Sequence, residues 1–259
     1  MMLIVAGLAI LGLLLGPSLG IVVDRAVDRL RPAAEHRCVH CQHPQGPGSL
    51  IPVVGWFRTC QGCDRYTGWR YPAVDVTTAI VFGLLGVRFV DDGSIDWKLW
   101  PYLALGAVLV VLSVIDIETH LLPNVLVWPA IGVSLFLVFV VSGELGDGDA
   151  ITAALLGGAI FGGFIGAAHL VHEQGMGRGD VKLALLLGLF VGWVETDLFV
   201  VTRLVLYALF LALLGGGLVG LAVNAIRRRG RAEIPFGPAL AAGSLAIILV
   251  SPAIAGTGP

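Results

Sequence analysis

A succession of long apolar segments, separated by short polar loops, is the feature that most constrains the fold of this sequence. A helix needs about 20 mostly apolar residues to cross a bilayer. Such helices are predicted, to within about 2–4 residues, at 2–23, 72–90, 98–115, 124–142, 150–171, 181–195, 198–223 and 236–255. Only 13 % of the 259 residues are charged, against about 25 % in a soluble domain. The sequence therefore predicts an all-α polytopic membrane protein with about eight transmembrane helices, the sixth being the shortest.

The distribution of charge predicts how these helices are oriented. Thirteen of the 16 lysines and arginines (seven, two and four) lie in segments 24–71, 172–182 and 227–231. The alternate loops, 91–97, 143–149 and 195–197, are acidic. Because basic loops stay in the cytoplasm, the first set is expected on the cytoplasmic side. Segment 2–23 is interpreted as a helix with its amino terminus outside, since it lacks the basic start and cleavage site of a signal peptide.

Small residues recur at four-residue spacing in two of the predicted helices. Such stripes allow helix backbones to approach closely in a membrane. We interpret both as packing surfaces: Gly158, Gly162 and Gly166 in one helix, and Ala208, Ala212, Gly216 and Gly220 in the other.

The polar segment 24–71 contains all four cysteines, arranged as two C-x-x-C pairs. Each pair can direct two thiolates to one point, and two pairs complete a tetrahedron around Zn²⁺. The alternative is a pair of disulfides, which would require an oxidising compartment. Because charge places this segment in the cytoplasm, we expect a structural zinc site without an open coordination position, with Cys38, Cys41, Cys60 and Cys63 as ligands.

Two aspartates are predicted at the cytoplasmic edge of the helical body. Asp116 ends the third apolar segment and Asp180 begins the sixth. Each has an ordinary structural explanation, since Asp180 could cap a helix and Asp116 could mark a helix end before Pro123. Ionisable groups at membrane depth are nevertheless expensive and usually functional. Together the two residues suggest a catalytic pair.

Two carboxyl groups held close together share a proton, which suits them to peptide hydrolysis. The ionised group takes a proton from the attacking water, and the protonated group polarises the scissile carbonyl. Gly177 and Gly179 lack side chains, so a substrate backbone could lie beside Asp180. Lys182 is expected either to hold this loop at the lipid surface or to influence the nearby charge.

Several motifs, in order along almost the whole chain, resemble those of the type IV prepilin peptidases, which are GxGD-type intramembrane aspartyl proteases. GMGRGDVKL at 175–183 contains the GxGD motif, and Ile115-Asp116 and Leu122-Pro123 precede it. The other matching segments are GPSLGIVVDR near the start, the two CxxC pairs, Arg70-Tyr71-Pro72 and Ile234-Pro235-Phe236-Gly237. The sequence differs from the usual family pattern at Gly20, Asp75 and Asn124, where Asn, Glu and an acidic residue respectively are usual.

The resemblance implies an enzyme of the bacterial inner membrane that cleaves the leader from prepilins or pseudopilins at the cytoplasmic face. It implies that Asp116 and Asp180 are catalytic and that the cysteine loop matches the family's loop. Many members also methylate the new amino terminus, using S-adenosylmethionine. The expected organisation is a first helix at 1–23, a zinc-binding loop at 24–71 and a protease core at 72–259. The expected partners are these substrates and membrane lipids, with no nucleic acid.

Two other functions fit part of the pattern. A transporter could use paired acidic residues to move protons or cations, but it would not account for the cysteine loop. A non-catalytic scaffold of pilus assembly could bind partners through that loop. Such a scaffold would tolerate Asp→Asn at both positions.

Overall fold

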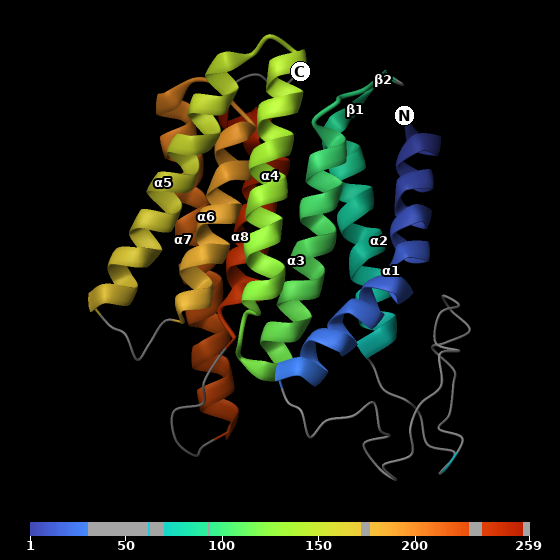
Figure 1. The fold of residues 1–259 in the computed structure, drawn as a ribbon, viewed down its shortest axis with the longest axis vertical. Coiled ribbons are helices and arrows are strands. Elements are labelled where there is room, and N and C mark those ends of the chain that lie inside the picture. Colours follow the sequence, from blue (N-terminus) through green and yellow to red (C-terminus); the bar gives the residue numbers. More distant parts are fainter. Residues whose placement is uncertain (31–61, 63–69, 93, 172–176, 228–234, 256–259) are drawn as a thin grey trace. The chain divides into compact units, whose positions relative to one another are not determined.

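A computed structural model describes residues 1–30, 62, 70–92, 94–171, 177–227 and 235–255 of the chain. The described part contains eight helices (Figure 1): α1 (Met2–Leu30), α2 (Arg70–Phe89), α3 (Leu99–Thr119), α4 (Asn124–Glu144), α5 (Gly148–Val171), α6 (Arg178–Trp193), α7 (Leu198–Arg227) and α8 (Gly237–Ala255). A short antiparallel ribbon follows α2, with β1 (Val90–Asp91) and β2 (Ser94–Ile95) pairing Val90 with Ile95 and Asp91 with Ser94.

The helices confirm the predicted all-α polytopic membrane fold. Seven of the eight described helices are long and apolar enough to cross a bilayer, and α6 is the exception. At 16 residues, α6 is about 24 Å long, which is shorter than the roughly 30 Å of a hydrocarbon core. The predicted bounds differ most at α1, which continues from 23 to Leu30 because no helix-breaking residue follows Val23.

The chain divides into two compact units, Met1–Thr119 and His120–Pro259. In the first unit α1 packs closely along α2. A Cβ at Gly12 would lie 2.9 Å from the Cα of Ala79, and one at Gly16 would lie 2.6 Å from the Cα of Asp75. Gly20 stands where the family pattern usually has Asn. The ring of Tyr71 occupies the space beside it, so the missing side chain leaves room for that ring.

Helix α3 completes the first unit and packs on both α1 and α2. Gly106 allows close contact, since a Cβ there would lie 2.7 Å from Cγ1 of Val81. The helix ends at Thr119, whose hydroxyl donates a hydrogen bond to the carbonyl of Ile115. His120 then adopts a φ of 53°, in the left-handed region that stops a helix.

In the second unit, α6 packs against α4, α5, α7 and α8 (Figure 1). Nearly every residue from Leu183 to Trp193 is buried, Leu185 being exposed. A helix that is apolar around its circumference and enclosed by other helices does not need to face lipid. Its enclosure therefore explains why α6 can be shorter than its neighbours.

The predicted glycine stripe in α5 faces α6, which confirms its interpretation as a packing surface. A Cβ at Gly158 would lie 3.1 Å from Leu189, and one at Gly162 would lie 3.1 Å from Leu185. The closest approach involves glycines that the sequence did not single out. A Cβ at Gly192 would lie 3.0 Å from the Cα of Gly157, so the two backbones touch there.

The second stripe faces α8 at three of its four positions. Gly243 of α8 contacts the backbone of Ala208 and Ala212, and Phe236 covers Gly216. Helix α4 runs parallel to α6 and is tied to its carboxyl end by a 2.8 Å hydrogen bond from Nε1 of Trp193 to Oγ of Ser142.

Candidate active site

Asp116 lies in the last turn of α3, within the first unit. It is buried, with 4 % of its surface exposed. The negative end of the helix dipole lies at this turn, where a carboxylate is disfavoured. An ionisable group buried at such a place is costly, so Asp116 stays a candidate for a functional role.

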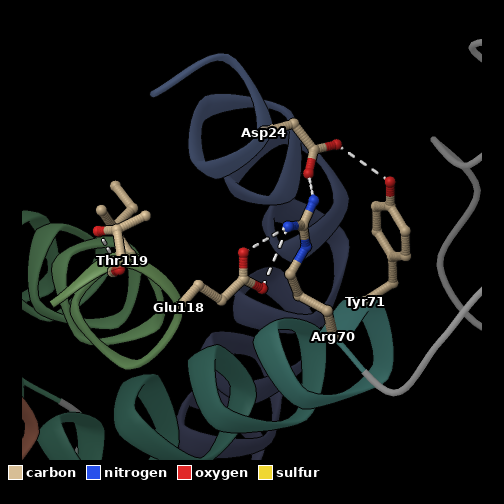
Figure 2. Close-up of polar contacts among 6 residues, drawn as sticks. Asp24, Arg70, Tyr71, Glu118 and Thr119 are labelled. Carbon is tan, nitrogen blue, oxygen red and sulfur yellow. Dashed lines mark hydrogen bonds and ion pairs between the residues drawn. The ribbon is translucent and has the colours of Figure 1, made fainter. Parts of the chain in front are cut away.

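A cluster of polar side chains joins α3 to α1 and α2 at the same end of the first unit (Figure 2). Nη1 of Arg70 donates to both carboxylate oxygens of Glu118, at 3.1 and 2.8 Å. Nη2 of Arg70 forms an ion pair with Oδ1 of Asp24. Tyr71 donates its hydroxyl hydrogen to Oδ2 of Asp24 over 3.0 Å. One guanidinium thus connects three helices.

Sequence reasoning did not identify this cluster as a structural unit. Asp24, Arg70 and Tyr71 occur only within the motifs that carry the family resemblance, and Glu118 is not among the predicted site residues. The available signal was the position of Asp24 and Arg70 on either side of the cysteine segment. That position indicates proximity, because the two helices flanking a loop often pack together.

Asp180 lies in the first turn of α6, in the second unit, and is 8 % exposed. Its Oδ2 accepts a 3.0 Å hydrogen bond from the backbone N–H of Gly177, the residue that precedes the helix. This is one half of a capping box, the other half being impossible because glycine has no side chain. Asp180 therefore contributes to the helix start, and the same bond fixes the direction of its carboxyl group.

The space beside Gly179 is filled by Leu122. A Cβ at Gly179 would lie 2.7 Å from the Cβ of Leu122 and 3.2 Å from its Cδ1. The missing side chain thus allows the segment before α4 to lie against the GxGD loop. Gly177, in contrast, is exposed.

Lys182 extends from α6 toward the start of α4. Its Nζ donates a 2.6 Å hydrogen bond to Oδ1 of Asn124 and lies 5.5 Å from the centre of the Trp128 ring. Both contacts hold the start of the second turn of α6 to the first two turns of α4. Lys182 thus contacts α4 through Asn124, and the role expected for it at the lipid surface stays a prediction.

The two aspartates belong to different compact units, so the proximity of their carboxyl groups stays a prediction. The predicted zinc ligands, Cys38, Cys41, Cys60 and Cys63, lie outside the described residues. Within the described ranges, no group of three or more His, Cys, Asp or Glu side chains could hold a metal ion.

Comparison with known proteins identifies two family models along the chain. Residues 10–89 match the bacterial peptidase A24 N-terminal domain, a range that covers most of α1 and all of α2. Residues 103–221 match the type IV leader peptidase family, which covers most of α3 through α7 and includes both Asp116 and Asp180.

Curated relatives resemble the chain over most of its length. A prepilin leader peptidase/N-methyltransferase of Aeromonas hydrophila is 33 % identical over 82 % of this chain and 70 % of its own length. The protein of that name from Bacillus subtilis is 30 % identical over 86 % of this chain and 84 % of its own length. One from Pseudomonas aeruginosa is 30 % identical, over 82 % and 70 %. No solved structure matches the chain.

Proposed function

The chain belongs to the type IV leader peptidase family, and we propose that it is a membrane aspartyl endopeptidase that removes the leader peptide from type IV prepilins or pseudopilins. The relatives carry this activity in their names. In this proposal the substrate is a membrane-anchored precursor, and the bond that breaks is a peptide bond at the edge of the membrane.

The observation that carries the proposal is the burial of Asp116 and Asp180 at helix ends within the segment that matches the family model. Buried carboxyls need a partner or a function. Asp180 has its direction set by the N–H of Gly177, and Asp116 lies on a turn that is anchored through Glu118. Both carboxyl groups are thus carried by helix ends that side-chain hydrogen bonds hold in place. General acid–base catalysis requires such fixed positions.

In the proposed mechanism the two carboxyl groups share one proton and bind one water molecule between them. The ionised group removes a proton from the water as its oxygen attacks the scissile carbonyl carbon. The protonated group donates to the carbonyl oxygen. The C–N bond then breaks as the amine nitrogen receives a proton, which leaves a carboxylate on the leader and a free amino terminus on the mature protein.

We assign loop-holding roles to Gly179 and Lys182, because Leu122 and Asn124 are their neighbours. Gly177 is exposed, so it is the better candidate for lying beside a substrate backbone. A substrate helix must also unwind locally before its peptide bond can reach the carboxyl groups.

A second activity, methylation of the new amino terminus, is part of the same proposal, because the relatives are named N-methyltransferases as well as peptidases. S-adenosylmethionine would supply the methyl group. Mass spectrometry of the processed pilin tests this activity. The mass should show one added methyl group on the terminal nitrogen.

For the cysteine segment we propose a structural zinc site. Four thiolates in two C-x-x-C pairs match the donor set and the tetrahedral geometry of structural Zn²⁺. The organisation in this proposal is a first helix at 1–23, a zinc-binding loop at 24–71 and a protease core at 72–259, with the loop and active site facing the cytoplasm. Metal analysis should find about one zinc per chain, lost on Cys→Ser.

The deciding experiment is co-expression of a prepilin with the wild type, Asp116→Asn or Asp180→Asn, followed by detection of the leader on a gel. Each substitution keeps the size of the side chain but removes its ability to exchange a proton, so leader removal should stop in both. Asp92→Asn, in the exposed turn after β1, is the matched control and should process normally. Processing by either catalytic-site variant would instead favour a scaffold, and proton-coupled transport without processing by the wild type would favour a transporter.

A further inference from the structure

The last turn of α3 carries an unusual concentration of negative charge. Asp116 and Glu118 both lie there, and α3 has no basic residue of its own in that turn. The helix dipole adds partial negative charge at the same end. A turn of this kind tends to fray, because helix ends open at little cost in free energy and carboxylates at the carboxyl end of a helix interact unfavourably with its dipole.

The positive charge that this turn lacks comes from α2. Arg70 binds both carboxylate oxygens of Glu118 through Nη1 and binds Asp24 of α1 through Nη2 (Figure 2). The side chains of Arg70 and Glu118 are 21 % and 24 % exposed, so the contact is partly shielded from water. Arginine can bind two carboxylates in fixed directions at once, whereas a lysine ammonium has no comparable fixed fork.

Through the geometry of the helix, the contact between Arg70 and Glu118 also determines the direction in which Asp116 projects. Successive residues turn by about 100° around the axis, so Asp116 and Glu118 project about 200° apart. Holding Glu118 on the side of α1 and α2 therefore directs Asp116 away from that side. The Thr119 hydroxyl, bonded to the carbonyl of Ile115, closes the same turn.

We propose that Arg70 is a positioning residue for Asp116, acting through Glu118 to hold the last turn of α3 closed and to fix its rotation. This inference rests on the proposed function, since it assumes that Asp116 is one of the two catalytic carboxyls. It assigns different tasks to the two contacts of Arg70: the Asp24 contact holds α1 to α2, and the Glu118 contact orients the site.

The test uses the purified full-length enzyme in lipid vesicles with a type IV prepilin as substrate. Glu118→Gln removes the charge from the α3 contact, and Arg70→Lys removes the fork while keeping the charge. Tyr71→Phe is the matched control, because it deletes one hydrogen bond to Asp24 and leaves Arg70 and Glu118 unchanged. Two quantities are measured for each variant: kcat and KM for leader cleavage, and amide hydrogen exchange in a peptide spanning 112–123.

Glu118→Gln should lower kcat about tenfold, equivalent to about 1.4 kcal/mol, while KM stays within about twofold because substrate binding is not altered. Exchange at 116–119 should become faster in the same variant. Arg70→Lys should give a smaller change in both quantities, and Tyr71→Phe should match the wild type in both. A loss of folded protein would also lower the apparent kcat without changing KM, so kcat is expressed per folded enzyme, and faster exchange at 116–119 in the folded enzyme identifies the local effect.

Wild-type kcat in Glu118→Gln, or an effect on KM alone, would overturn the proposal. Unchanged exchange at 116–119 would overturn it as well. The exchange measurement needs no catalysis, so it tests the anchoring of α3 even if the wild type cleaves no prepilin. That last result would refute the proposed function instead.

Discussion

Nζ of Lys182 lies 2.6 Å from Oδ1 of Asn124, so the second turn of α6 is hydrogen-bonded to the first turn of α4. The family pattern usually has an acidic residue at position 124. Here an amide takes its place, and the contact is a hydrogen bond between a charged donor and a neutral acceptor. Because Asp180 lies two residues before Lys182, this contact also holds the turn that carries one proposed catalytic carboxyl.

Asn124→Asp should strengthen this contact by converting it into an ion pair. The pair is exposed, so the gain in the free energy of unfolding should be below about 1 kcal/mol. Lys182→Met should have the opposite sign, because it removes both the hydrogen bond and the contact with the Trp128 ring. Thermal unfolding in detergent measures both changes, and identical midpoints for the two variants would show that the contact contributes nothing.

Gly179→Ala should disrupt the contact between the GxGD loop and the segment before α4. The new Cβ would lie 2.7 Å from the Cβ of Leu122, and overpacking of this kind costs about 1–3 kcal/mol. Leader cleavage should fall strongly, and Leu122→Gly in the same chain should restore part of it, because it removes the Cβ that the new methyl group would meet.

Gly132→Ala is the control for that series, since no atom lies within 4 Å of the position that its Cβ would take. It should cleave at the wild-type rate. Failure of Leu122→Gly to restore any activity would mean that Gly179 matters for a reason other than its contact with Leu122, such as direct contact with the substrate.

The contact between α5 and α6 should be the most sensitive packing surface of the second unit. A Cβ at Gly188 would lie 2.7 Å from the Cβ of Phe161 and 2.9 Å from the carbonyl carbon of Gly157. Gly188→Ala should therefore lower the free energy of unfolding by about 1–3 kcal/mol or more, because two backbones would have to separate.

Gly163→Ala, on α5, should change stability in the other direction. Its Cβ would meet no atom within 4 Å, and alanine in a helix interior is favoured over glycine by roughly 0.5–1 kcal/mol. Thermal midpoints of the two variants, measured side by side, compare the two effects. Equal midpoints would contradict the packing described for α5 and α6.

The helices could be predicted from sequence because each depends on a local property, a run of apolar residues long enough to cross a bilayer. Asp116 and Asp180 could be singled out for a related reason, since ionisable residues at membrane depth are costly and rare. The motif around Asp180 then pointed to the family. Even the short sixth helix was visible in the sequence, although its enclosure by four others was not.

Contacts between distant segments could not be predicted in the same way. Arg70 meets Glu118 across 48 residues, and Lys182 meets Asn124 across 58. Such pairs depend on the rotation of each helix about its axis, which packing determines and hydropathy does not. The contact of Leu122 with Gly179 could not be predicted for the same reason. A glycine indicates that something lies close, and only the fold identifies the neighbour.

The central claim is that Asp116 and Asp180 act on one water molecule, and the distance between their carboxyl groups tests it most directly. The measurement is an experimental structure of the enzyme with a leader-spanning peptide bound in the membrane. Each oxygen would lie about 2.5–3.0 Å from the shared water, so the nearest carboxyl oxygens should be within about 6 Å of each other. Carboxyl groups too far apart for one water to bridge, with the scissile bond in place, would contradict the account.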